Sequence, residues 1–224
     1  MLAEKKALLL IGSPKSKNST SESLGNYLLE GLHKKGYVCD KFHILTVLKN
    51  NADELFSKVN DTDLLIISFP LYVDNLPSPL IRALELIGEN RKERRNIKEQ
   101  KLIAIANNGF PESFHNYTSL NICKNFAGKA GFQWIGGFVM GSGAAINGKP
   151  IEQLGGMTRN KVAALDMAVE AIAKDSEIPP AAFELMSGRL IPTPLYVFMA
   201  NQGWKTQAKR LGAKKELYAK PYLK

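Results

Sequence analysis

The segment GSPKSKNSTSE (residues 12–22) gathers hydroxyl and lysine side chains between an apolar run and a helix-like pattern. Ser19 followed by Glu22 has the spacing of a capping box, which predicts a helix that begins at residues 19–21. The first N–H groups of that helix would lack intrahelical acceptors, and its dipole would be positive there. These features suit a phosphate group, bound by the hydroxyls of Ser13, Ser19, Thr20 and Ser21. The alternative is an ordinary helix cap on a solvated loop, for which one hydroxyl is enough.

Three common phosphate-binding patterns do not fit this segment. A P-loop needs glycine and lysine at positions 17 and 18, where the chain has Lys17 and Asn18. The dinucleotide fingerprint GxGxxG fails because its second glycine is missing after Gly12. A phospho-acceptor receiver domain would place acidic residues where Gly12 and Ser68 stand. The segment therefore predicts a site for a monophosphate that is held by hydroxyls and amides.

A second unusual loop, SFPLYVDNLPSPL (residues 68–80), follows the most apolar run of the chain. Its prolines stiffen the backbone around Tyr72, whose ring offers a flat face to a planar ligand, and Asn75 offers polar contacts. The alternative is that the aromatic side chains only pack beneath a proline-rich connection.

A third loop, NNGFPES (residues 107–113), follows another apolar run. Asn107, Asn108 and Gly109 would present amides and backbone N–H groups at the end of a strand, where they suit the polar edge of a heterocycle. The alternative is an ordinary Asn-Gly turn.

These loops need a scaffold that brings them to one place, and the hydrophobic pattern predicts one. Short runs that are apolar on both faces alternate with amphipathic helical patterns, which indicates a parallel sheet covered on both sides. Ligands bind such sheets beyond the carboxyl ends of the strands, where all three loops would lie. The predicted strands are residues 7–11, 37–44, 64–69, 102–106 and 134–140, and the predicted helices are about 20–32, 51–59, 79–87, 116–130 and 158–174.

The three loops resemble the cofactor loops of the flavodoxin-like NAD(P)H-dependent oxidoreductases, the group of FMN reductases, quinone reductases and iron–sulfur flavoproteins. The resemblance spans about residues 5–175 and implies a doubly wound five-stranded parallel sheet of order 2-1-3-4-5. Lys15 stands where arginine is commoner in that group, and the cluster cysteines of the iron–sulfur branch are absent. By this resemblance the FMN phosphate would be held by Ser13, Lys15, Ser19, Thr20 and Ser21, and the flavin ring would meet Pro70, Leu71, Tyr72, Asn75, Asn108, Gly109 and Phe110.

The resemblance also implies the reaction. NAD(P)H would be the co-substrate and FMN the cofactor, with electrons passing to a quinone, a free flavin or a similar small-molecule acceptor. We name no catalytic acid or base, because such chemistry asks the protein for orientation and exclusion of water. Members of this group commonly pair, so a homodimer is expected. Two alternatives remain: a flavodoxin-type electron carrier, although such carriers are usually acidic, and a flavin-free binding protein of the same fold.

The net charge of +9 is concentrated at the end of the chain. Residues 201–224 contain seven lysines and arginines against one glutamate, so the body is nearly balanced and a nucleic-acid partner is not indicated. We expect a flavodoxin-like domain over residues 1–176. A basic helical extension over residues 177–224 would pack on that domain or on a dimer mate. The alternatives for this extension are an anionic membrane, a redox partner or the extra phosphate of NADPH.

Other features exclude whole classes of protein. The longest apolar run, residues 64–73, is too short to span a bilayer, and no cleavable leader is evident, so we expect a cytoplasmic protein that does not associate with a membrane. Cys39 and Cys123 lie far apart without metal-ligand spacing, which predicts small buried side chains and no metal site. The charged run ENRKERRNIKEQK (residues 89–101) is expected to be a solvated helix end and loop.

Overall fold

The computed structural model describes residues 4–15, 17–50, 52–94 and 98–222 of the 224-residue chain. The chain forms two compact units, one that ends at Leu190 and one that begins at Ile191. Each is described by itself. The first contains the sheet and every loop that the sequence singles out.

The sheet of the first unit has five parallel strands in the order β2-β1-β3-β4-β5, which confirms the predicted topology. The central strands are apolar on both faces because each face is covered by helices. The strands are β1 (Lys6–Ile11), β2 (Val38–His43), β3 (Leu64–Pro70), β4 (Lys101–Asn107) and β5 (Gln133–Met140).

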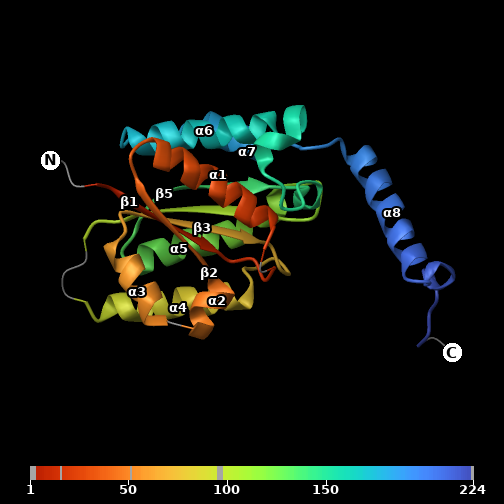
Figure 1. Cartoon of the computed structure of the whole chain (residues 1–224), viewed down its shortest axis with the longest axis horizontal. Helices are drawn as coiled ribbons and strands as arrows, with labels where there is room; N and C mark the ends of the chain where they lie inside the picture. The colour runs from red at the N-terminus through yellow and green to blue at the C-terminus, as the bar shows by residue number, and fades with distance from the viewer. Residues whose placement is uncertain (1–3, 16, 51, 95–97, 223–224) are drawn as a thin grey trace. The chain divides into compact units, whose positions relative to one another are not determined.

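The helices form a layer on each side of the sheet (Figure 1). One layer consists of α1 (Thr20–Lys34), α6 (Arg159–Ala173) and α7 (Pro180–Ser187). The other consists of α2 (Ile44–Asn50), α3 (Ala52–Asp61), α4 (Ser78–Lys92) and α5 (Tyr117–Lys129). Short 3-10 segments follow β4 and β5, namely η1 (Phe114–Asn116), η2 (Gly143–Ala145) and η3 (Ile151–Met157).

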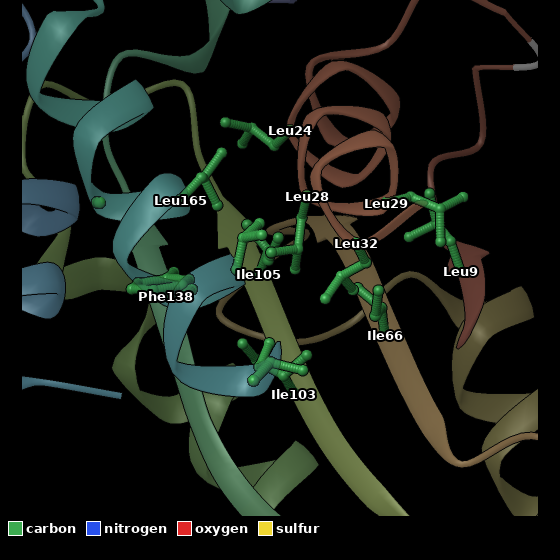
Figure 2. Packing of buried hydrophobic residues seen from close by; sticks show 14 of the residues in the cluster. Leu9, Leu24, Leu28, Leu29, Leu32, Ile66, Ile103, Ile105, Phe138 and Leu165 are labelled. Atoms are coloured by element: carbon green, nitrogen blue, oxygen red, sulfur yellow. The ribbon is translucent and has the colours of Figure 1, made fainter. Parts of the chain in front are cut away.

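The alternation of side chains along the strands divides the core into two clusters. Leu9 and Ile11 of β1 face α1 and α6, whereas Leu8 and Leu10 face the opposite layer. Figure 2 shows the first cluster, in which Leu28 of α1 meets the strands. Burying each side chain of this size contributes about 2 kcal/mol to folding, so both layers hold their helices firmly against the sheet.

Two local predictions require correction. The strand expected over residues 37–44 ends at His43, because Ile44 begins a helix, α2, that the sequence analysis did not predict.

The charged run of residues 89–101 is not uniformly solvated, since Arg91 is almost fully buried. Its guanidinium donates to the carbonyls of Ala130 (2.6 Å) and Gly131 (3.2 Å) and to the Gln100 side chain, and it lies 3.8 Å from the centre of the Phe132 ring. Arg91 therefore connects the end of α4 to the end of α5.

The predicted domain boundary at residue 176 falls inside the first unit. Helix α7 packs on α6 and β5, and its Ala182 and Met186 belong to the core. Lys161 of α6 is buried beneath the end of α7, where its Nζ donates to the carbonyls of Leu185 (2.9 Å) and Met186 (2.8 Å). Burial lowers the pKa of Lys161 to about 8. The extension that remains is shorter than expected.

The second unit contains α8 (Thr193–Arg210) and the short segment η4 (Lys214–Glu216). Its apolar side chains include Phe198 and Trp204, which are both exposed. Lysines and arginines follow in its second half. Among the residues that the structure describes, no helix is long and apolar enough to cross a bilayer.

Candidate functional site

A cavity of about 250 Å³ opens at the carboxyl edge of the sheet, where the loops after β1, β3, β4 and β5 meet. Ten of the twelve residues expected at the site line it, and Asn75 and Phe110 do not. Its lining residues are Ser13, Lys15, Asn18, Ser19, Thr20, Ser21, Pro70, Leu71, Tyr72, Asn107, Asn108, Gly109, Gly143, Ala144 and Asn147.

The beginning of α1 forms one end of this cavity. Ser19 is the N-cap, and its Oγ accepts a hydrogen bond from the N–H of Glu22 at 3.0 Å, as the capping pattern predicts. The return bond differs from a standard capping box, because Glu22 Oε2 accepts from the N–H of Asn18 (2.9 Å), one residue earlier. Both bonds fix the loop against the helix, so that the positive end of the helix dipole faces the cavity.

Three serine hydroxyls of this region accept hydrogen bonds and keep their own protons available. The oxygen of Ser13 accepts from the N–H of Lys15 (3.2 Å), and that of Ser19 accepts from Glu22. The oxygen of Ser21 accepts from Nδ2 of Asn107 at 2.8 Å. An acceptor bond does not use the hydroxyl proton, so each serine can donate to an oxyanion.

Thr20 differs from the serines, because its hydroxyl donates to the carbonyl of Gly143 at 2.7 Å. A carbonyl can only accept, so the Thr20 proton is committed to a link between α1 and the loop after β5. Thr20 lines the cavity as expected. In this arrangement the Thr20 side chain stabilises the cavity wall, and its hydroxyl proton is not available to bind an anion.

The loop after β3 turns back on itself between Tyr72 and Asn75. The two residues exchange backbone hydrogen bonds of 2.9 and 3.0 Å around Val73 and Asp74, which both have left-handed backbones (φ 48° and 57°). That pattern matches a type I′ turn, in which valine is rare because its branched Cβ is strained there. Tyr72 lines the cavity with about half of its surface exposed. Asn75 faces its own turn, where its Oδ1 accepts from the N–H of Leu76 (2.7 Å).

The loop after β4 forms the opposite side of the cavity. Asn107 and Asn108 are buried, and the backbone of Gly109 borders open space, since a Cβ placed there would have no heavy atom within 4 Å. Oδ1 of Asn108 accepts from the N–H of Phe110 (2.8 Å), and its Nδ2 donates to the carbonyl of Glu112 (3.0 Å). The Asn108 side chain therefore shapes the loop, whereas the exposed ring of Phe110 lies outside the cavity lining.

Sequence reasoning missed part of the wall. Asn18, Ala144 and Asn147 line the cavity, together with Gly143. These residues lie together because the loop after β5 packs closely against the loop after β1. The contact is so close at Gly148 that a Cβ placed there would lie 1.9 Å from the carbonyl oxygen of Asn18. The segment GSGAAING (residues 141–148) follows a predicted strand, and its position at the same sheet edge was the available signal.

Two other features help to define the site. A larger, mainly apolar cavity of about 440 Å³ lies between α4 and α5, lined by side chains such as Ile81, Leu84 and Phe126. Its lining contains one side-chain amide, Asn125, and no hydroxyl side chain, whereas the smaller cavity gathers several of both, so we place the chemistry in the smaller cavity. Within the described ranges, no group of three or more His, Cys, Asp or Glu side chains is arranged to hold a metal ion.

The chain was compared with known proteins. No protein-family model matches it, and no curated protein sequence matches it. Among solved structures it is similar to an FMN-dependent NADH-azoreductase from Bacillus anthracis in complex with FMN (16% identity, TM-score 0.52, covering 75% of this chain and 99% of that one). It is also similar to an NADH:FMN oxidoreductase in its apo form (16% identity, TM-score 0.54, 85% and 98%). A third is the Trp repressor binding protein from Bacillus subtilis (11% identity, TM-score 0.55, 71% and 95%).

These likenesses, together with the strand order, show that the chain has the flavodoxin-like α/β fold that its sequence predicts. At this level of identity they show the fold alone, so function rests on the chemistry of the site.

Proposed function

We propose that this protein is an FMN-dependent NAD(P)H oxidoreductase that passes electrons to a small-molecule acceptor such as a quinone or a free flavin. The observation that carries the proposal is the cavity at the beginning of α1, which is lined by a helix N-terminus and by three serines whose hydroxyls accept hydrogen bonds and can still donate. The names of two similar structures, which refer to FMN and NADH, support the same conclusion.

The residues present fit FMN. Ser13, Ser19 and Ser21 can donate to its phosphate, and Lys15 at the same end of the cavity adds positive charge. The exposed face of Tyr72 and the open space beside Gly109 suit a flat ring system between the second and third loops. Bound FMN would supply the chemistry of hydride acceptance and electron donation.

The chain itself contributes position and surroundings. The cap on α1 fixes the anion-binding end, and the turn at Tyr72 and the loop at Asn108 fix the two sides. A cofactor held in this way presents its ring in one orientation to a nicotinamide or an acceptor, which lowers the entropic cost of their encounter. This role requires no acid or base side chain.

The surroundings of the reaction are proposed as well. We propose a cytoplasmic homodimer that does not bind nucleic acid. The open apolar cavity between α4 and α5 supports pairing, because a surface of this kind gains stability when a second copy covers it. Sedimentation equilibrium of the purified protein tests the dimer.

The proposal is tested by loading the purified protein with FMN and following its visible spectrum and its NADH or NADPH oxidation. We expect tight FMN binding and steady NAD(P)H consumption with a quinone or free flavin. FMN binding without turnover would instead indicate an electron carrier, and no FMN binding would reject both.

A charge substitution locates the phosphate. Ser21→Asp places a carboxylate beside the proposed phosphate and should weaken FMN binding by about 100-fold or more through repulsion. Asn26→Asp adds the same charge further along α1, outside the cavity lining, and should leave the affinity within about threefold. Equal affinities in the two variants would mean that the phosphate lies elsewhere.

A further inference from the structure

Three aromatic rings form a row beside the candidate site, on the loop that follows β4. The His115 ring lies between two phenylalanines, with ring centres 4.7 Å from Phe110 and 4.3 Å from Phe114. Both phenylalanines are more than half exposed, at 56% and 55%. Each phenylalanine packs on the imidazole at a tilt, with 41° and 34° between the ring planes, and Gly109, one residue before the row, lines the cavity.

The backbone beneath this row is held in place. The carbonyl of Phe110 accepts from the N–H of Ser142 (2.6 Å), and the side chain of Asn116 donates to the carbonyl of Met140 (3.2 Å). The side chain of Ser113 donates to the carbonyl of Ser187 (2.7 Å). These bonds attach the loop to the end of β5 and to α7, so the backbone that carries the three rings is preorganised.

The row is also joined to the cavity wall. Gly143 lines the cavity, and its N–H donates to the carbonyl of Asn108 at 2.7 Å. The preceding residue, Ser142, donates its N–H to the carbonyl of Phe110. The loops after β4 and β5 therefore carry the cavity wall on one side and the aromatic row on the other. A ligand that rests on the row lies at the rim of the proposed flavin site.

We propose that Phe110, His115 and Phe114 form a binding platform for the electron acceptor, and that the acceptor is a flat ring with carbonyl groups, of the quinone class. Two phenylalanine faces suit stacking on a planar ring, and the imidazole between them can donate a hydrogen bond to a ring carbonyl. This inference rests on the proposed function, because it assigns the acceptor side of the same site.

Steady-state kinetics of the FMN-loaded protein, with NADH and 2-methyl-1,4-naphthoquinone, test the platform. Phe110→Ala and Phe114→Ala should each raise the KM for the quinone by about 3- to 10-fold, the range expected for loss of one stacked ring. The KM for NADH and the affinity for FMN should stay within about twofold. Phe110→Tyr keeps the ring and should restore a KM close to that of the wild type. The matched control is Tyr117→Ala, which removes an exposed ring that packs toward Phe183 instead of the row.

The possible outcomes separate this inference from the proposed function. A wild-type protein that binds no FMN overturns both. A protein that binds FMN and oxidises NADH, but whose quinone KM is unchanged by both alanine variants, overturns the platform alone. A rise in the KM for NADH in place of that for the quinone would assign the row to the nicotinamide and also overturn it. A change in oligomeric state in the alanine variants would show that a second copy of the chain covers the row, and this result would also overturn the platform.

Discussion

The side-chain amide of Asn107, at the end of β4, donates to the hydroxyl oxygen of Ser21, in the first turn of α1, at a distance of 2.8 Å. The same amide nitrogen donates to the carbonyl of Phe69 (3.0 Å), which fixes the orientation of the Asn107 side chain. Ser21 must therefore accept, and its proton is directed away from this bond. Asn107, at the start of the loop after β4, thus orients the hydroxyl of Ser21, which follows the loop after β1.

Asn107→Ala should weaken FMN binding by about 5- to 10-fold, because the Ser21 hydroxyl loses the bond that orients it. Titration with FMN, followed by flavin fluorescence, measures the change. Asn60→Ala removes a comparable amide bond, to Asn90, outside the cavity lining and serves as the control, with unchanged affinity. Equal effects of the two variants would show that Asn107 acts only through general stability.

Replacing Val73 with asparagine should raise the free energy of unfolding by about 1 kcal/mol. Val73 has a left-handed backbone and is almost fully exposed, so the substitution relieves strain without removing packing. Urea denaturation measures the gain. Val38→Asn is the control, since Val38 is an exposed valine in the regular strand β2 and should lose stability on substitution. A Val73→Asn variant that is no more stable than the wild type would show that the turn is not strained.

The charge on Lys161 should make stability rise with pH between about 8 and 10.5. Burial lowers the pKa of Lys161 to about 8 from its usual 10.5, so in this window the unfolded chain keeps a proton that the folded chain has released. Stability therefore increases with pH by this contribution, by about 2 kcal/mol across the window. Urea denaturation of the wild type and of Lys161→Met at several pH values measures it as the difference between the two proteins.

The exposed lysine Lys34 provides the control for that experiment. Lys34→Met should follow the wild-type profile across the same window. A constant difference between the wild type and Lys161→Met would mean that Lys161 stays charged when the chain is folded.

Shortening the chain tests where the first unit ends. A chain that ends after Leu190 retains α7 and should unfold cooperatively at a temperature close to that of the full chain. A chain that ends after Ser176 loses α7, uncovers the core around Ala182 and Met186, and removes the carbonyls that Lys161 binds. It should lose about 3–5 kcal/mol of folding free energy, because the apolar side chains of α7 no longer cover the core. Similar melting of the two shortened chains would place the boundary nearer residue 176.

Both cysteines should react slowly with a thiol reagent in the folded protein at pH 8. Burial raises the pKa of Cys39 to about 11 and that of Cys123 to about 12, so very little of either side chain is thiolate. Labelling with Ellman's reagent should be at least 100-fold slower than in concentrated urea, where both thiols react. Rapid labelling of one thiol in the native protein would show a local opening that exposes it.

The sequence predicts the sheet well because the central strands are apolar on both faces, as in residues 64–69. It does not predict α2, because Ile44 and Val47 extend the apolar pattern of the preceding strand, and only their packing beneath the sheet makes them helical. The domain boundary was misplaced for a related reason. The pair Pro179-Pro180 has the composition of a linker, yet Pro180 is the first residue of α7, where its fixed φ suits a helix start.

The candidate site shows the same limit. The serines of the first loop are predictable because capping is a local pattern that spans three residues. The direction of each hydroxyl is not, because it depends on Asn107 for Ser21 and on Gly143 for Thr20, both distant in the chain. Short-range chemistry is readable from the sequence, whereas the choice of donor or acceptor is made by the tertiary structure.

Gly148 lacks any side chain to offer a ligand, yet the contact between the loops after β1 and β5 depends on it. Its bare Cα, with a left-handed backbone, lets the last loop rest directly on the carbonyl of Asn18, and a single methyl group there would push the two apart. The spacing of these two loops is therefore fixed by the absence of a carbon atom at one position and not by a hinge. A substitution intended to admit bulkier molecules would begin at this position, which does not line the cavity itself but lies between Asn147 and Asn18 of its wall.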